Sequence, residues 1–112
     1  MSIAGDLIRG HTDAIILARL LHGDNYGYEI NKIISSLSSG RFELKEATLY
    51  TAFRRLEEQG YIISYWGDSG AGARRRYYAI TPAGRMASQT LRREWEETKE
   101  IMDKLMEAEE EA

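Results

Sequence analysis

The sequence contains no cysteine, and its 112 residues include only two histidines and a single proline. Without cysteine the chain can form neither a disulfide nor a thiolate metal site. No stretch approaches the roughly 20 apolar residues that a membrane-spanning helix requires, and no positively charged, apolar leader precedes Asp6. We therefore expect a cytoplasmic protein that does not associate with a membrane.

The scarcity of catalytic residue types argues against an enzyme. His11 and His22 are the only histidines, and both lie near the ends of a short predicted helix. No Ser/His/Asp spacing, paired-carboxylate pocket, metal cluster or phosphate-binding loop accompanies them. We therefore predict no catalytic residue, no bound metal and no cofactor.

Charge is unevenly distributed along the chain. The formal net charge is −3, but residues 94–112 hold nine acidic residues against two lysines, a net of −7. The segment 41–93 instead holds ten basic residues against five acidic ones, a net of +5. Because phosphate binding responds to the local potential, a chain with a negative total can still carry a surface for nucleic acid.

The whole chain is long enough for one modest hydrophobic core. Two amphipathic helices are predicted in its first third. The first should run from about Asp13 to Leu21 with Thr12 as its N-cap. An apolar arm of Ile3, Leu7 and Ile8 precedes it and could either continue the helix or fold separately. The second should begin after Asp24 or Asn25, either of which can cap it, with apolar residues at Ile30, Ile33, Ile34 and Leu37.

A third helix should begin near Lys45 or Glu46 and end before Gly60, because glycine readily adopts the left-handed conformation that often follows a helix. Its apolar stripe, Leu49, Phe53 and Leu56, should face inward. The opposite surface should carry Thr48, Thr51, Ala52 and Arg55, with Tyr50 and Arg54 at its margins. Tyr50 could also belong partly to the core.

A β-hairpin is predicted after this helix. Residues 61–66 and 76–80 are rich in aromatic and β-branched residues, and the segment 67–73 between them is turn-forming. Because side chains alternate along a strand, Arg74 and Arg76 should point one way and Arg75 the other, and Tyr77 and Tyr78 should also lie on opposite faces. We expect Trp66 to belong to the core at the base of the hairpin.

The last helix should be long, from Pro82 to about Met106, with Thr81 as its N-cap. Its apolar positions repeat at intervals of 4, 3, 4 and 3 residues, which is the spacing of a helix–helix seam. A second copy of the chain is the simplest partner for this seam. The predicted dimer-interface residues are Leu91, Trp95, Thr98, Met102 and Leu105.

A helix followed by a basic hairpin favours a reader of double-stranded DNA, because arginine binds phosphates and guanine edges bidentately and hydroxyls donate to phosphates. The fold class is therefore mainly α with a small β-hairpin wing, a winged helix-turn-helix over residues 1–81 with a C-terminal dimerisation helix over 82–112. The predicted DNA-binding residues are Lys45, Thr48, Tyr50, Thr51, Arg54, Arg55, Arg74, Arg75 and Arg76. A winged-helix module for an acidic protein partner is the alternative.

Several motifs in order resemble the PadR family of transcriptional regulators, in its short branch with one C-terminal helix. They are YGYE at 26–29, EATLY at 46–50, RLEEQGYI at 55–62, YWG at 65–67 and RRRYYAITPAG at 74–84. The resemblance implies a dimeric repressor that binds a palindromic operator, with the third helix in the major groove and the region of Gly72 and residues 74–76 as the wing.

Within that family the chain is similar to the multidrug-binding repressors, in which a tryptophan of the last helix flanks a planar aromatic drug. Trp95 stands at the matching position. The resemblance further implies that Leu7, Ala14 and Leu17 line the same pore, and that a small planar aromatic effector releases the repressor from DNA.

Overall fold

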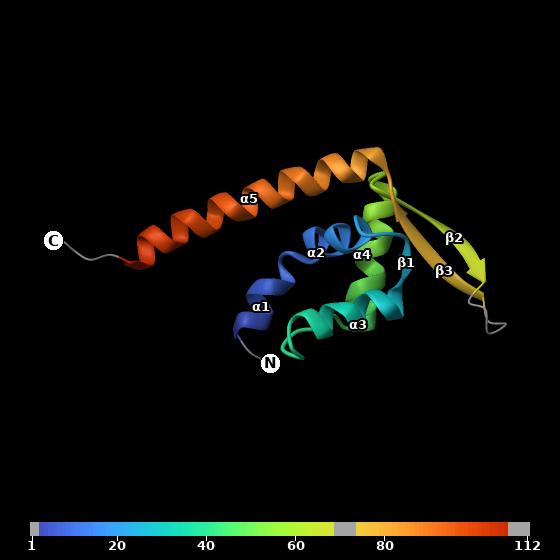
Figure 1. The fold of residues 1–112 in the computed structure, drawn as a ribbon, viewed down its shortest axis with the longest axis horizontal. Coiled ribbons are helices and arrows are strands. Elements are labelled where there is room, and N and C mark those ends of the chain that lie inside the picture. Colours follow the sequence, from blue (N-terminus) through green and yellow to red (C-terminus); the bar gives the residue numbers. More distant parts are fainter. Residues whose placement is uncertain (1–2, 69–73, 108–112) are drawn as a thin grey trace.

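The computed structural model describes residues 3–68 and 74–107, which form five helices and a small three-stranded antiparallel sheet (Figure 1). In chain order the elements are α1 (Ile3–Arg9), α2 (Thr12–Leu20), β1 (Asn25–Tyr26), α3 (Gly27–Leu37), α4 (Glu46–Glu58), β2 (Ile62–Asp68), β3 (Arg74–Ile80) and α5 (Pro82–Glu107). The predicted fold class is confirmed. Gly67 and Asp68, expected in the turn, extend β2, and the rest of the turn, including Gly72, lies outside the described residues.

The sheet has the strand order β1-β3-β2, and its first strand was not predicted. Asn25 and Tyr26 pair with Tyr78 and Tyr77, and two residues are too few to show any periodicity. The prediction that Asp24 or Asn25 caps the second helix is wrong, because Tyr26 occupies the cap position and both side chains bond elsewhere. The Asn25 Oδ1 accepts the N–H of Tyr26 at 2.9 Å, and the Asp24 Oδ2 accepts the hydroxyl of Tyr65 at 2.7 Å.

The N-terminal arm folds separately as α1 and ends just before Gly10. Thr12 is not an N-cap as predicted but the first residue of α2, and its hydroxyl donates to the carbonyl oxygen of Arg9 at 2.7 Å. His11 occupies the cap position without a side-chain hydrogen bond to the helix. The hydroxyl of Thr12 therefore ties α2 back to α1 instead of satisfying a free N–H of its own helix.

The hydrophobic core lies between α2, α3, α4 and the base of the sheet. Phe53 of α4 stacks on Tyr78 of β3, with ring centroids 3.9 Å apart and planes inclined by 17°. Both rings are buried, and the aliphatic side chains around them are almost fully enclosed. These side chains are Ile16, Leu17, Leu20, Ile30, Ile34, Leu44, Leu49, Leu56 and Ile62.

Asn31 fixes the connection between α3 and α4. Its side-chain amide donates to the Leu44 carbonyl oxygen at 2.6 Å and accepts the Leu44 N–H at 2.8 Å. This pair of bonds satisfies the backbone N–H and carbonyl of Leu44, which have no partner in a helix or strand. The residues just before Glu46 are therefore held against α3, and this sets where α4 begins.

The junction of α4, β2 and α5 agrees with the sequence expectations. Gly60 has a φ of 80°, the left-handed conformation that ends α4, and the Tyr61 N–H bonds the Leu56 carbonyl oxygen at 3.0 Å. The Thr81 hydroxyl accepts the N–H of Gly84 at 3.0 Å and donates to the Gly60 carbonyl oxygen at 2.7 Å. A Cβ at Gly84 would overlap the Tyr61 carbonyl oxygen, so glycine allows α5 to start against β2.

The helix α5 packs on the core at its start and then leaves it. Ala87 and Leu91 contact the core, whereas every residue from Arg92 to Glu107 is exposed. The described molecule is accordingly elongated, with principal extents of 65 × 30 × 21 Å, and Figure 1 shows α5 projecting beyond the helical body. Within the described ranges, no helix is long and apolar enough to cross a membrane.

Candidate nucleic-acid interface

The helix α4 presents a core face and two different exposed sides. Leu49, Phe53 and Leu56 face inward as predicted. Ala52, expected on the opposite surface, is completely buried, because α2 and the sheet enclose a wider arc of the helix than its apolar stripe indicates. Arg54 and Thr51 are exposed, and Lys45 is exposed immediately before the helix.

The predicted DNA-binding residues of α4 do not all lie on one side. Tyr50 faces α3: its ring meets Phe53 edge-on at 5.5 Å, and its hydroxyl lies where a Cβ of Gly27 would stand. It is 40% exposed, so both the core role and the surface role that the sequence left open are partly realised. Thr48, Thr51 and Arg55 instead line a groove on the other side of the helix.

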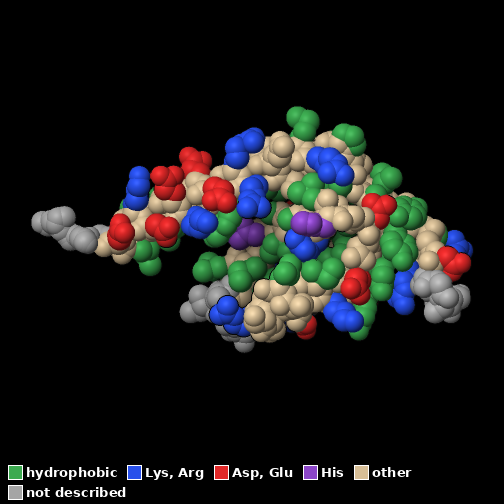
Figure 2. Space-filling model, viewed as in Figure 1, with side chains coloured by type: hydrophobic (Ala, Val, Ile, Leu, Met, Phe, Trp, Pro, Cys, Tyr) green, Lys and Arg blue, Asp and Glu red, His purple; other side chains and the backbone are tan. Residues whose placement is uncertain are grey.

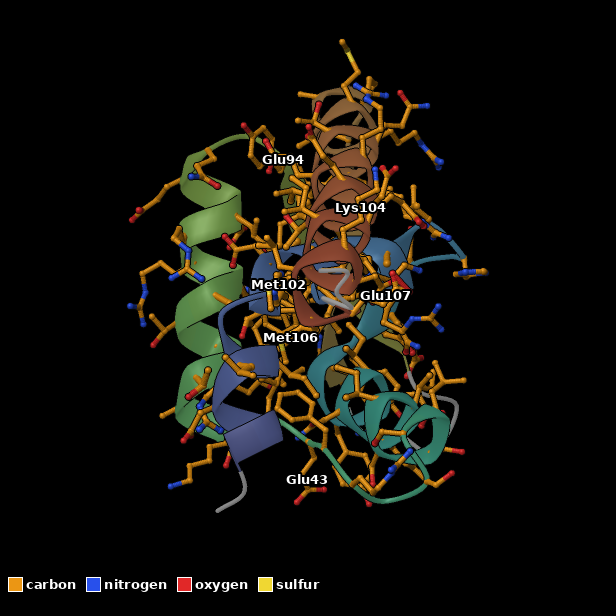
Figure 3. All side chains as sticks on the ribbon, turned by 90° about the vertical axis from the view of Figure 1, so that its left-hand side faces the viewer. Glu43, Glu94, Met102, Lys104, Met106 and Glu107 are labelled. Atoms are coloured by element: carbon orange, nitrogen blue, oxygen red, sulfur yellow. The ribbon has the colours of Figure 1, made fainter. Side chains whose placement is uncertain are left out.

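This groove has a volume of about 810 Å³ and lies between α2, α4 and α5. Its lining includes His11, Asp13 and Ala14 at the start of α2, Thr48, Thr51 and Arg55 of α4, and Leu91, Glu94, Trp95 and Thr98 of α5. Figure 3 shows Glu94 between α5 and α4. Threonine hydroxyls, both signs of charge and one indole therefore share a single open cavity.

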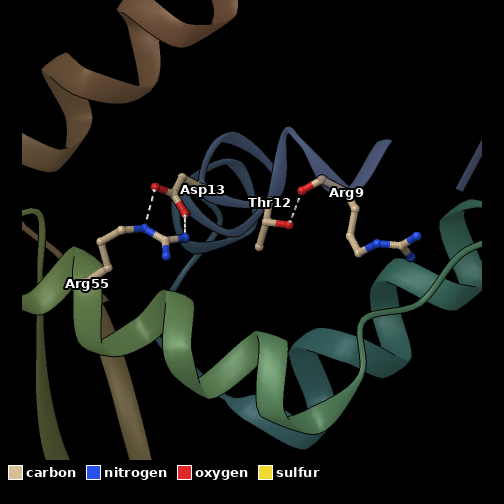
Figure 4. A network of polar contacts seen from close by, with 4 residues as sticks. All are labelled: Arg9, Thr12, Asp13 and Arg55. Atoms are coloured by element: carbon tan, nitrogen blue, oxygen red, sulfur yellow. Dashed lines mark hydrogen bonds and ion pairs between the residues drawn. The ribbon is translucent and has the colours of Figure 1, made fainter. Parts of the chain in front are cut away.

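Arg55 crosses the groove to α2. Its Nε and Nη2 donate to the two carboxylate oxygens of Asp13 at 3.2 and 2.5 Å (Figure 4). The hydrogen bond that Arg55 donates to Asp13 raises the pKa of Arg55, so the guanidinium stays charged. A bidentate pair of this kind fixes orientation as well as charge. Arg55 is therefore engaged within the chain, whereas Arg54 is exposed and is not among the residues that line the groove.

The wing arginines alternate as expected. The guanidinium of Arg74 lies 5.2 Å and that of Arg76 6.0 Å from the centre of the Trp66 ring, whereas Arg75 lies 4.5 Å from the ring of Tyr26 on the opposite face. Tyr78 is buried and Tyr77 half-buried on the other face, which also agrees with the prediction. The three arginines thus occupy two faces of the hairpin.

Arg76 also ties the wing to the end of α4. Its Nη2 donates to the Ser64 Oγ at 2.8 Å and lies 3.7 Å from a carboxylate oxygen of Glu57. The Ser64 hydroxyl in turn donates to Glu57 at 2.7 Å. This three-residue network fixes the angle between hairpin and helix, and it was not predicted, because its members are separated in sequence.

Trp66 is not the core residue that we predicted. Its side chain is 57% exposed, because β2 continues past the point where the helices cover the sheet. Figure 1 shows the ends of β2 and β3 standing clear of the helical body. An aromatic residue in a strand usually indicates burial, and the length of the free hairpin could not be read from the pattern.

Only part of the predicted ligand-binding set comes together. Trp95 and Ala14 line the groove, and the ring of His11 meets Trp95 edge-on at a centroid distance of 5.3 Å. Leu17 is fully buried in the core, and Leu7, 69% exposed on α1, is not among the residues that line the groove. Within the described residues, no group of His, Asp or Glu is arranged to hold a metal ion.

The predicted seam on α5 is exposed in the single chain. Trp95 is 45%, Met102 47% and Leu105 67% exposed, and Leu91 is the one seam residue that packs against the core. In Figure 3, Met102 and Met106 lie on one side of α5 and Lys104 on another, and Figure 2 shows acidic and basic side chains along the projecting part. The helix therefore has an apolar side without a covering element among the described residues.

A helix pair, α3 and α4, followed by a hairpin that carries arginines defines a winged helix-turn-helix protein of the DNA-binding class. A family model, "Transcriptional regulator PadR-like family", matches residues 16–90. The chain belongs to this family. Regulators of the family bind DNA and are not enzymes, so the prediction of a non-enzymatic, DNA-binding regulator is confirmed.

The chain is also similar to one protein of known sequence and to two solved structures. An uncharacterised protein of Lysinibacillus sphaericus is 48% identical over 94% of this chain and 96% of its own length. A transcriptional regulator from Clostridium thermocellum is 48% identical, with a TM-score of 0.83 over 92% of this chain and 97% of its own. A PadR family transcription regulator from Clostridium difficile is 34% identical, with a TM-score of 0.75 over 86% and 98% of the two chains.

The different environments of Arg54 and Arg55 generate a prediction. Arg54→Ala should weaken duplex binding and reduce the slope of log affinity against log salt by about 1, because one phosphate contact is lost. Arg55→Ala should leave the slope unchanged and lower the free energy of unfolding by at most about 1 kcal/mol, since its pair with Asp13 is half-exposed. DNA-binding isotherms at several salt concentrations and urea unfolding measure the two effects.

Asp13→Asn is the matched control, because it weakens the same ion pair without removing a positive charge. It should reproduce the unfolding result of Arg55→Ala. If Arg55→Ala lowers the salt slope as Arg54→Ala does, while Asp13→Asn leaves stability unchanged, then Arg55 binds DNA and its pair with Asp13 has no structural role.

Proposed function

We propose that the protein is a homodimeric repressor that binds a palindromic operator through α4 and the wing. The observation that carries this proposal is the position of Arg54 and the wing arginines, which lie exposed or half-exposed on the two elements that contact DNA in winged helices. Lys45, Thr48, Tyr50 and Thr51 would add contacts from the first turns of α4. Occupation of the operator would then exclude polymerase sterically.

The charge distribution supports DNA binding by α4 and the wing. Apart from Glu94, which lines the groove beside α4, the acidic residues of α5 lie on the part of the helix that projects away from the wing (Figure 1), so their repulsion of phosphates acts at a distance. Exposed charges separated by more than a Debye length, about 8 Å at physiological salt, are largely screened. The basic segment can therefore bind DNA even though the whole chain is net negative.

A salt titration tests DNA binding by this surface. Duplex affinity should fall steeply as salt rises from roughly 50 to 200 mM, because bound cations are released from the phosphates. In a selection from random-sequence duplexes, an inverted repeat should be enriched with half-sites about 34 Å apart. Affinity that is independent of salt, with no repeat enriched, would favour the protein-interaction module instead.

Dimerisation through α5 is the second part of the proposal. The exposed seam of Trp95, Met102 and Leu105 has the spacing of knobs on a helix pair, and a two-fold axis would bury the seam of one copy against the other. Residues 82–112 would then form the dimerisation segment. Two reading heads on one operator require such a rigid connection.

Met102→Glu should disrupt the dimer. Burying an unpaired charge costs roughly 3 kcal/mol or more, so the dimer dissociation constant should rise about a hundredfold or more. Gln89→Glu adds the same charge at an exposed position of α5 outside the seam and should leave the constant unchanged. Sedimentation equilibrium measures both, and equal behaviour of the two variants would exclude this seam as the interface.

The third part of the proposal is release by a planar aromatic effector in the groove beside Trp95. Trp95 is half-exposed, and an indole offers a flat stacking surface. Because α2, α4 and α5 all contribute to the lining, a bound molecule could change the position of α4 relative to the dimer axis. Release requires only that the effector prefer the arrangement with the lower DNA affinity.

Quenching of tryptophan fluorescence tests the effector site. Trp66→Phe leaves Trp95 as the only indole, and planar aromatic dyes should still quench it at micromolar concentration and lower operator affinity. Trp95→Ala should lose the effect of the dye on DNA binding. If the Trp95→Ala protein still dimerises and still releases DNA on adding the same dye, the effector acts elsewhere.

A further inference from the structure

Trp66 is exposed near the end of the wing, and the structure provides no core role for it. It pairs with Arg76 across the hairpin. The preceding pair on this face is Ser64 with Tyr78, and Tyr78 of β3 is still buried. A tryptophan side chain left 57% exposed loses much of the burial that usually stabilises an aromatic residue in a strand. This position therefore calls for a surface that covers the indole.

The indole points to the same side of the hairpin as α4. Side chains two residues apart share a face of a strand, so Trp66 lies on the face of Ser64. The Ser64 hydroxyl bonds Glu57 near the end of α4, and Tyr78 on the same face stacks on Phe53 of α4. Trp66 thus lies beyond the end of the core, on the same side of the molecule as the reading helix.

Two guanidinium groups flank the indole and have different surroundings. Arg76, 6.0 Å from the ring centre, is held by Ser64 and by the carboxylate of Glu57. Arg74, 5.2 Å from the ring centre, is exposed opposite Asp68 at the outer end of the described hairpin. Arg76 therefore orients the indole from the side of α4, and Arg74 adds positive charge on the outer side.

We propose that Trp66 is a DNA-contact residue whose indole packs against deoxyribose in the minor groove beside the site read by α4. Arg74 then binds an adjoining phosphate, and Arg76 acts as a positioning residue. The flanking charge selects DNA over an apolar protein surface, because the minor groove combines strongly negative potential with apolar sugar edges. This inference rests on the proposed DNA-binding role of the wing.

Such a contact makes a distinctive contribution to binding. An indole displaces no counterion, so it adds affinity without adding to the salt dependence, in contrast to an arginine that binds a phosphate. Deoxyribose is common to every nucleotide, so the contact also tolerates changes of sequence beneath it. Contact by Trp66 would therefore raise affinity for any duplex that α4 holds in the right position against the wing.

The test compares three variants of the full chain on an operator selected from random-sequence duplexes. Trp66→Ala should weaken operator binding by roughly tenfold or more, as truncation of a buried interface tryptophan commonly does, and should leave the salt slope unchanged. Arg74→Ala should lower the slope by about 1. Ile63→Ala is the matched control, because Ile63 is 56% exposed on the opposite face of β2 and should not contact DNA.

A direct probe is ¹⁹F NMR of protein labelled with 5-fluorotryptophan, which gives one signal for Trp66 and one for Trp95. The signal missing from Trp66→Phe belongs to Trp66. On saturation with operator DNA it should shift and lose its solvent isotope effect between H₂O and D₂O. Binding affinities and the ¹⁹F signal together distinguish a Trp66 that contacts DNA from a Trp66 that only holds the arginines in place.

The outcomes are decisive in each direction. Weaker binding at constant slope, with a protected Trp66 signal, supports the contact. Affinity no lower than that of Ile63→Ala overturns it, as does a reduced slope with an unprotected signal, because Trp66 would then only hold the arginines. If no duplex binds the wild-type protein in a salt-dependent manner, the proposed function itself fails.

Discussion

The stack of Phe53 on Tyr78 is the contact on which the functional surface depends. It joins the reading helix to the middle strand of the sheet, with the two rings nearly parallel and both excluded from solvent. Since side chains alternate along a strand, placing Tyr78 against α4 also places Arg74 and Arg76 on that side and Arg75 on the other. One buried pair therefore determines which wing arginines share a side with α4.

The same helix faces two partners that serve different purposes. Toward α2 and α5 it lines the groove that contains Trp95, and Arg55 spans that groove to reach Asp13. Toward the wing it is fixed by Glu57 through Ser64 and Arg76. Arg55 and Glu57 both lie in the last turn of α4, so the contact to the groove and the contact to the wing meet at the same end of the reading helix.

Both tryptophans lie on elements that continue beyond the core. Trp66 is on the free part of the hairpin and Trp95 is on the helix that projects from the body, and each is about half exposed in the single chain. Exposed aromatic side chains in such positions are typical of binding surfaces. The two sites differ in their neighbours: Trp66 stands between two arginines, whereas Trp95 meets His11 beside an apolar seam.

The sequence by itself determined the elements whose signals are local. The glycine that ends α4, the threonine cap of α5, the hairpin and the alternation of its arginines all follow from residues adjacent in the chain, and the order of several motifs indicated the family. Only the tertiary structure decided the burial of Ala52, the exposure of Trp66, the short strand β1 and the pairing of Asp13 with Arg55. Each of these depends on which distant segment packs against the residue, and periodicity within one element carries no information about the extent of its neighbour.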